Sequence, residues 1–242
     1  MTITKYNASG NTFVIFHTNK REDYSSLAIK LCKEERADGL IVVLPHNSYD
    51  FEWLFYNNDG STASMCGNGT RAVAHYACEN KISDSFVKFL TRAGEINCNV
   101  TNDIVETTMP NPTILKEEFE EFGFTWWMID TGVPHLVTIV EDLDTFNVEL
   151  CSKMRYKYNA NVNYAKIEDE ILRVRTYERG VEAETLACGT GMTACFLRAL
   201  NLNLITNEIG VYPKSGEKLM LKKNKIGLYF KGQVSKEYSK EL

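Results

Sequence analysis

The chain has 242 residues, of which 44% are hydrophobic and 24% are charged, with 15 Gly and 5 Pro. This composition is ordinary for a globular protein and excludes a disordered, collagen-like or low-complexity chain. The net charge of −5 argues against a general nucleic-acid binder, which would carry a basic patch or stripe. No apolar stretch approaches the roughly 20 residues that a membrane-spanning helix needs.

The cysteine and histidine content favours a reduced, cytoplasmic protein without a metal site. Seven cysteines is an odd number, and residues 1–6 lack the apolar segment of a secretory signal. No CxxC motif occurs, and no histidine has metal-ligand spacing with a cysteine. Together with the charge and the lack of a long apolar stretch, this argues against a metal, nucleic-acid or membrane partner.

Apolar periodicity divides the first half of the chain into strands and two helices. Helical spacing predicts a helix over residues 25–35, capped by Ser25 or Ser26. A second helix is expected over residues 70–79, opened by a glycine-rich loop. Strand patterns occupy residues 2–16 with a turn at 8–11, residues 40–44 and residues 51–56.

The second half follows the proline-containing segment at residues 109–112 (MPNP), which is the best candidate for a linker. Helices are expected over residues 148–158 and from near Met192 onward. Strands are expected at residues 128–129, at 136–140 and in a hairpin of 162–167 with 171–177.

One short motif occurs once in each half of the chain. Residues 66–72 read CGNGTRA and residues 188–194 read CGTGMTA, so the cysteine, both glycines and the alanine agree in register. Each copy follows a strand hairpin and a polar turn and precedes an apolar helix. The copies lie about half a chain length apart. We infer an internal duplication with one CGxG site in each half.

A single CGxG segment before a helix is open to several interpretations. Its glycines let the backbone approach a ligand closely, and the start of the helix presents unpaired N–H groups that suit a carboxylate or phosphate. The positive end of the helix dipole also lowers the pKa of a cysteine placed there. A nucleophilic cysteine, a redox thiol and a packed structural cysteine are all compatible with one copy.

Two copies favour a reaction that uses both thiols, Cys66 and Cys188. If the halves face each other, one thiolate removes a proton from a ligand carbon and the opposite thiol returns one from the other side, which inverts that carbon. The helix N-termini would stabilise the charge that develops on a carboxylate as its α-carbon is deprotonated. Two alternatives are a redox disulfide between the cysteines and a Cys–His hydrolase that uses His135.

Five motifs, in order along nearly the whole chain, resemble those of the diaminopimelate epimerase family of cofactor-independent amino acid epimerases. They are KYNASGNTF (residues 5–13), NNDGSTASMCGNGTR (57–71), GVPHLV (132–137), NVNY (161–164) and YERGVEAETLACGTG (177–191). The combination of MCGNG and ACGTG is highly specific to this family.

The resemblance implies an α+β fold of two similar domains related by a pseudo-two-fold axis. Each would be a curled β-sheet or barrel around a central helix, with the active site between the domains. We expect an N-terminal domain of residues 1–110 plus about 226–242, and a C-terminal domain of residues 111–225. The resemblance also implies an enzyme without a cofactor, and a homodimer is expected by analogy.

The resemblance also implies roles for individual residues. Cys66 and Cys188 would be the acid/base pair, and His135 would lie near the thiols and bias which of them is ionised. The reacting carboxylate would be bound by the backbone N–H groups of Gly67, Asn68, Gly189 and Thr190. The reacting ammonium would be held by Asn11 and the carboxylate of Glu178. The distal end of the substrate would be bound by Asn57, Asn161 and Arg179.

We therefore expect interconversion of LL-2,6-diaminopimelate and meso-diaminopimelate, on the route to lysine and peptidoglycan. Arg179 favours a substrate with a second carboxylate, which the fork of a guanidinium meets bidentately. The chain departs from the family pattern at Val133, at Gly39 and in the shortened segment of residues 32–40. Alternatives are a racemase or epimerase of proline, hydroxyproline or histidine, and a non-catalytic thiol redox or small-acid-binding protein.

Overall fold

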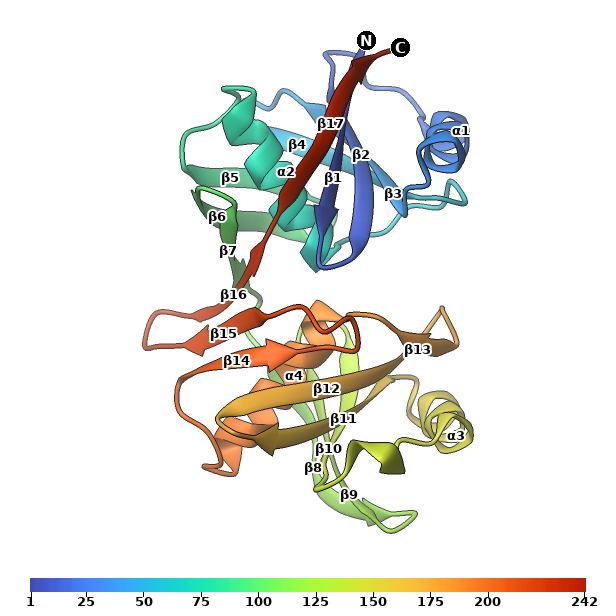
Figure 1. Ribbon diagram of the computed structural model, residues 1–242, viewed down its shortest axis with the longest axis vertical. Helices are drawn as coiled ribbons and strands as arrows, with labels where there is room; N and C mark the ends of the chain where they lie inside the picture. The colour runs from blue at the N-terminus through green and yellow to red at the C-terminus, as the bar shows by residue number, and fades with distance from the viewer. The chain divides into compact units, whose positions relative to one another are not determined.

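In the computed structural model, which describes residues 1–242, the chain divides into two units (Figure 1). Unit 1 comprises Met1–Thr108 and Lys231–Leu242, and unit 2 comprises Met109–Phe230. The chain therefore passes from one unit to the other twice. None of the helices combines the length and the apolar character that crossing a membrane would require.

Unit 1 contains two helices, α1 (Ser25–Glu35) and α2 (Gly67–Glu79). Its strands are β1 (Thr2–Ala8), β2 (Asn11–His17), β3 (Gly39–Leu44), β4 (Phe51–Asn57), β5 (Phe86–Thr91), β6 (Gly94–Thr101), β7 (Ile104–Met109) and β17 (Ser235–Glu241). The passages between the units run through the end of β7 and through β16 (Leu228–Gln233).

Unit 2 contains α3 (Val148–Tyr158), α4 (Gly189–Asn201) and a short 3-10 helix (Leu143–Thr145). Its strands are β8 (Thr113–Glu121), β9 (Phe124–Asp130), β10 (Pro134–Ile139), β11 (Asn161–Glu168), β12 (Ile171–Glu178), β13 (Ala183–Thr185), β14 (Glu208–Tyr212) and β15 (Leu219–Lys223).

In unit 1 the sheet separates two apolar cores, and alternate residues of β3 enter each of them. Ile41 and Val43 pack in the core around α2, whereas Leu40 and Val42 pack in the core beneath α1. Side chains along a strand alternate between the two faces of a sheet, so a strand covered on both faces is apolar throughout. This explains the unbroken apolar sequence of β3.

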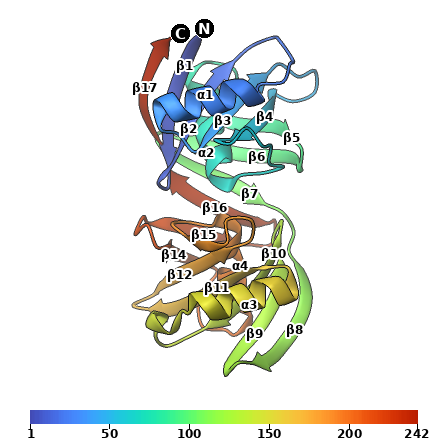
Figure 2. The same cartoon turned by 90° about the vertical axis from the view of Figure 1, so that its right-hand side faces the viewer.

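Unit 2 repeats this arrangement with α4 in the central position and α3 on the outer face (Figure 2). On β11, Val162 and Tyr164 pack in the core beneath α3, whereas Ala165 packs in the core around α4. By the same alternation, Asn161 and Asn163 share the face of Ala165. The strand therefore directs two buried polar side chains toward the side of the sheet that holds α4.

The pairing of strands is the same in the two units. In unit 1, β1–β2 and β3–β4 are antiparallel, and β2–β3 and β4–β5 are parallel. In unit 2, β9–β10 and β11–β12 are antiparallel, and β10–β11 and β12–β14 are parallel. This repeat agrees with the duplication inferred from the CGxG motifs. Each sheet curls around its central helix without closing into a barrel, and the α+β class is confirmed.

The predicted helix boundaries match α1 and α3 at both ends but are wrong at the start of the two central helices. The structure begins α2 at Gly67 rather than at Thr70, and α4 at Gly189 rather than near Met192. Glycine has a low helix propensity, so the pattern placed the CGxG segments in loops. The structure instead makes each motif the first turn of its helix.

The predicted cap of α1 is also wrong. Tyr24 is the N-cap, and its side chain makes no capping hydrogen bond. The Ser25 N–H is satisfied by the Asp23 carboxylate at 2.9 Å, so an aspartate outside the helix replaces the expected serine hydroxyl.

The alternation of burial along β5 yields a matched pair of substitutions. Phe89 is fully buried and its ring stacks on Phe51, with centroids 4.7 Å apart, whereas Phe86 on the same strand is 56% exposed. Phe89→Ala should lower the free energy of unfolding by about 3–5 kcal/mol, and Phe86→Ala should change it by less than about 0.5 kcal/mol. Urea unfolding followed by circular dichroism measures both, and equal losses would contradict this packing.

Candidate active site

The two cysteines of the repeated motif occupy the same position in their units. Cys66 is the N-cap of α2 and Cys188 is the N-cap of α4, both with extended backbone. Their carbonyl oxygens accept the first helical hydrogen bonds, from the N–H groups of Thr70 at 2.8 Å and Met192 at 2.9 Å. The N–H groups of the turn in between lack an intrahelical acceptor and form the positive end of the helix dipole.

In unit 1 the thiol itself takes part in capping. The N–H of Gly69 donates to Cys66 Sγ at 3.4 Å. A hydrogen bond donated to a sulfur stabilises its thiolate form. The N–H groups of Gly67 and Asn68 come before the first helical hydrogen bond and have no acceptor within the helix. They can therefore donate to an external acceptor such as a carboxylate.

A buried arginine orders the loop at the start of α2. Arg71 is fully buried and donates to Asn68 Oδ1 at 2.8 Å and to Ser9 Oγ at 2.5 Å. Asn68 Nδ2 in turn donates to Asn11 Oδ1 at 2.5 Å. The predicted site residues Asn11 and Asn68 are therefore joined directly. Asn57 is placed differently: it ends β4, and its Nδ2 donates to Ser61 Oγ at 2.9 Å in the following turn.

In unit 2 the Cys188 thiol lies within a polar network. Its Sγ is 3.5 Å from the hydroxyl of Thr190, and that hydroxyl is 2.9 Å from His135 Nε2. The backbone carbonyl of Thr190 accepts a hydrogen bond from the Thr131 hydroxyl at 2.9 Å. The first turn of α4 is therefore fixed by residues of the β9–β10 hairpin, and the Thr190 hydroxyl lies between His135 and the Cys188 thiol.

His135 is neutral over the working pH range of a protein. Its side chain is fully buried on β10, and this burial lowers the pKa of the imidazole to about 3. The nearby charge of Arg179 adds to this shift. A neutral imidazole has one N–H donor and one nitrogen acceptor. If one ring nitrogen accepts a hydrogen bond, the other therefore carries the proton and donates.

Asn161, Glu178 and Arg179 lie around the end of the β11–β12 hairpin. Asn161 Oδ1 accepts a hydrogen bond from the Arg179 N–H at 2.7 Å, and the Arg179 guanidinium donates to the Asn159 carbonyl at 2.9 Å. Burial raises the pKa of the Glu178 carboxyl, while the nearby Thr185 hydroxyl opposes the rise. A carboxylate held in such surroundings gains stability when a cation binds beside it.

The second glycine of the unit 2 motif is required by close packing. A Cβ atom at Gly191 would come within 2.4 Å of Asn163 Oδ1, 3.1 Å of Thr176 Oγ1 and 3.3 Å of Cys188 Sγ. The absence of a side chain lets the polar pair on β11 and β12 approach the first turn of α4.

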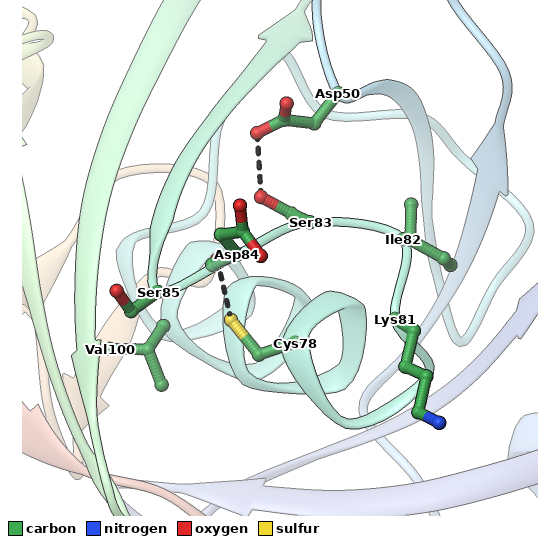
Figure 3. Close-up of a pocket in the computed structure, with 8 residues that line it drawn as sticks. All are labelled: Asp50, Cys78, Lys81, Ile82, Ser83, Asp84, Ser85 and Val100. Atoms are coloured by element: carbon green, nitrogen blue, oxygen red, sulfur yellow. Dashed lines mark hydrogen bonds between the residues drawn. The ribbon is translucent and has the colours of Figure 1, made fainter.

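The other five cysteines pack in or against the apolar cores. Burial raises the pKa of each thiol, to about 11 for Cys32 and to about 12 for Cys98 and Cys151, with upward shifts also for Cys78 and Cys195. Cys78 lines a cavity of about 490 Å³ in unit 1, where its thiol donates to the Asp84 carbonyl (Figure 3). Asp50 and Asp84 further raise the pKa of Cys78, so this group stays in its unreactive thiol form near neutral pH.

Among the buried polar residues around the two cysteines, Arg71, Asn163 and Thr176 are absent from the sequence prediction. Asn163 carried a signal, because the NVNY motif places Asn161 and Asn163 two residues apart and hence on the same face of a strand. Thr176 has no such signal, since its role depends on its pairing opposite Asn163 in the β11–β12 ladder.

Fold and site together define a duplicated α+β protein in which a cysteine caps the central helix of each half. Sequence comparison identifies the group to which it belongs. The chain is a member of the diaminopimelate epimerase family, whose family model matches residues 3–115 and 127–236.

Individual relatives match over nearly their whole length. A diaminopimelate epimerase from Nitratiruptor sp. is 54% identical over 242 residues, which cover 98% of this chain and 97% of the relative. A diaminopimelate epimerase from Helicobacter pylori is 41% identical over 255 residues, covering 97% of this chain and 93% of the relative.

Solved structures of low sequence identity share the fold. A phenazine biosynthesis protein of the PhzF family from Enterococcus faecalis matches with a TM-score of 0.78 at 13% identity, over 100% of this chain and 98% of that chain. A probable proline racemase from Agrobacterium radiobacter K84 matches with a TM-score of 0.73 at 12% identity, over 100% of this chain and 92% of that chain. These likenesses concern the fold alone.

The packing of Gly191 predicts a large effect of a single methyl group. Gly191→Ala should lower the free energy of unfolding by about 1–3 kcal/mol, because the new Cβ overlaps Asn163 Oδ1. Gly67→Ala is the matched control, since a Cβ there meets no atom within 4 Å. Chemical denaturation of both variants checks the prediction, which fails if Gly191→Ala is as stable as Gly67→Ala.

The burial of His135 predicts a loss of stability in acid. The ordinary pKa of 6.5 applies to the unfolded chain, which takes up a proton below that pH that the folded protein does not. The free energy of unfolding should therefore fall by about 1.4 kcal/mol per pH unit from this group as the pH drops from about 6 toward 3.

This prediction is checked by urea unfolding at several pH values. His135→Gln should show a shallower decline of stability with falling pH than the wild type. His46→Gln, at a half-buried histidine outside the network, should keep the wild-type slope. The same slope in all three proteins would contradict the assignment of a buried neutral His135.

Proposed function

We propose that this protein interconverts LL-2,6-diaminopimelate and meso-diaminopimelate by a proton transfer at one α-carbon that uses two cysteines. The observation that carries the proposal is the pair of helix-capping cysteines, Cys66 and Cys188. It is supported by relatives 41–54% identical that are named diaminopimelate epimerase. The substrate is a small molecule, the chemistry needs no cofactor, and a cytoplasmic homodimer is the expected form.

The proposed reaction starts from one thiolate and one thiol. The thiolate takes the α-proton, the C–H bond breaks, and its electron pair delocalises onto the neighbouring carboxylate. The opposite thiol then gives its proton to the other face of the carbon, and a new C–H bond forms with inverted configuration. The two sulfurs exchange protonation states, so the reverse reaction starts from the product form of the enzyme. Such a pair titrates as a coupled unit.

The weak acidity of an amino acid α-proton makes stabilisation of the developing charge essential. The N–H groups at the starts of α2 and α4, those of Gly67, Asn68, Gly189 and Thr190, are proposed to bind the reacting carboxylate. Both helix ends are fixed before any ligand arrives, by Arg71 in unit 1 and by His135 in unit 2. Preorganised N–H donors of this kind are among the strongest contributions to rate in acyl and enolate chemistry.

The remaining predicted residues would hold the two ends of the substrate. Asn11 and Glu178 are proposed to bind the reacting ammonium. Its positive charge would stabilise the ionised Glu178 carboxylate and offset the burial that raises the pKa of this group. Asn57, Asn161 and Arg179 are proposed to bind the distal group. Arginine has five N–H donors, so the bond from Arg179 to the Asn159 carbonyl leaves others for a carboxylate.

Single cysteine variants test the two-thiol mechanism. Cys66→Ser and Cys188→Ser should each lower the rate of epimerisation by about a hundredfold or more, because a hydroxyl is a far weaker acid than a thiol. Both variants should still bind diaminopimelate in calorimetry, since the N–H groups are retained. Cys78→Ser is the control and should keep wild-type activity. Near-full activity of either active-site variant would refute the mechanism.

A substrate panel separates the proposal from its alternatives. LL-diaminopimelate, proline, trans-4-hydroxyproline and histidine are each incubated with the reduced protein, and the stereoisomers are separated by chiral chromatography. Conversion of diaminopimelate alone is the expected result. Conversion of another amino acid instead would keep the two-thiol mechanism but assign a different substrate. Conversion of none would favour a redox or binding role.

A further inference from the structure

We propose that Asn163, oriented in part by Thr176, is a positioning residue for the Cys188 thiol. It holds His135 in a single tautomer, and this tautomer turns the hydroxyl proton of Thr190 toward the Cys188 sulfur. The network therefore favours the thiolate at Cys188. As a statement about catalysis this inference rests on the proposed function, but the hydrogen-bond directions can be measured without substrate.

The order of donors and acceptors in this series of hydrogen bonds is set at a backbone carbonyl. Asn163 Nδ2 lies 2.9 Å from the Leu136 oxygen, which can only accept a hydrogen bond. The opposite end of the amide, Asn163 Oδ1, accepts a hydrogen bond from the Thr176 hydroxyl at 2.9 Å. Turning the amide over would place two oxygens against each other at the Leu136 carbonyl. The side chain of Asn163 therefore has one orientation.

The oriented amide determines the tautomer of His135. The second hydrogen of Asn163 Nδ2 points at His135 Nδ1, 3.0 Å away. A proton on Nδ1 would face that hydrogen, so Nδ1 is the acceptor. Because burial keeps the imidazole neutral, its one proton is on Nε2.

The Nε2 proton then determines the direction of the last hydrogen bond. The Thr190 hydroxyl oxygen, 2.9 Å from Nε2, accepts from His135, which leaves the Thr190 proton to donate elsewhere. The Cys188 sulfur lies 3.5 Å from this hydroxyl. Asn161 Nδ2 also lies near Nε2, at 3.4 Å. An amide NH₂ group cannot accept the Nε2 proton, so the nearer Thr190 oxygen is the acceptor.

A hydroxyl that donates to sulfur stabilises the thiolate relative to the thiol. The reverse tautomer would make Thr190 donate to His135 and present a lone pair to Cys188, which would favour the protonated thiol. The residue beside His135 Nδ1 thus decides whether the Thr190 hydroxyl favours the thiolate or the thiol form of Cys188.

The positions of unit 1 that correspond to His135, Asn163 and Thr176 are apolar, so Cys66 has no equivalent of this hydrogen-bonded series. In the β10–β11 ladder His135 pairs with Asn161, as Phe13 pairs with Gly39 in the β2–β3 ladder. By the same correspondence, the pair of Asn163 and Thr176 matches the pair of Ile41 and Phe55. These three apolar side chains, Phe13, Ile41 and Phe55, all belong to the core around α2. The duplication therefore keeps both cysteines but gives them different surroundings.

The first experiment observes the tautomer directly in the ¹⁵N-labelled protein. Long-range ¹H–¹⁵N spectra distinguish a protonated ring nitrogen from an unprotonated one, and the signals of His135 are assigned by their loss in His135→Gln. We expect an unprotonated Nδ1 and a protonated Nε2 near pH 7. In Asn163→Leu, which lacks the amide donor, this preference should be lost. A protonated Nδ1 in the wild type would overturn the proposal.

The second experiment measures the rate at which iodoacetamide alkylates Cys188 and Cys66 as a function of pH, resolved by peptide mass spectrometry. Thr190→Val removes the hydroxyl and should slow the reaction of Cys188 at pH 7 by about tenfold, shifting its profile to higher pH. Thr190→Ser keeps the hydroxyl and should restore the wild-type profile. The rate at Cys66 in the same molecules should stay constant.

The two experiments separate this inference from the proposed function. An unchanged alkylation profile of Cys188 in Thr190→Val would refute the inference even if the protein epimerises diaminopimelate. The expected tautomer and profile in a protein that converts no diaminopimelate would refute the proposed function and leave the positioning network standing. The Thr190 pair remains informative if Asn163→Leu fails to fold.

Discussion

The helix start that follows a cysteine is the physical feature on which the site depends. In α2 and α4 the residue that would cap the helix with a hydroxyl or carboxylate is Cys66 or Cys188, so a polarisable sulfur meets the positive end of the dipole. The glycines that follow allow other groups to pack close to this turn, which is most evident at Gly191. One short motif therefore combines a thiol with backbone N–H donors suited to an anion.

The duplicated fold provides this feature twice but surrounds it differently. Behind Cys66 the sheet presents the aromatic and aliphatic side chains of a core, whereas behind Cys188 it presents buried polar groups. Buried polar groups are costly unless they are fully hydrogen-bonded, and those around His135 satisfy one another. The same topology thus places two cysteines in different surroundings, which under the proposed mechanism would bias which sulfur is ionised before the substrate binds.

The sequence predicts the parts of the structure that rest on local patterns. The apolar periodicity identifies α1 and α3, and the repeated CGxG motif identifies both central helices and the duplication. It does not predict β8, whose side chains (TILKEEFEE) are largely exposed and show no alternation of burial. Nor does it predict Thr176, whose contact with Asn163 arises only from strand register. Long-range pairing and amide orientation are properties of the folded chain.

The central claim is that one α-carbon exchanges its proton through these thiols without a cofactor. Incubation of LL-diaminopimelate with the fully reduced protein in D₂O, followed by mass spectrometry and chiral separation, tests it most directly. The account predicts that deuterium enters the α-position as the meso isomer appears, with no added cofactor. Absence of exchange in diaminopimelate, under conditions where the protein is folded and its thiols are reduced, would contradict it.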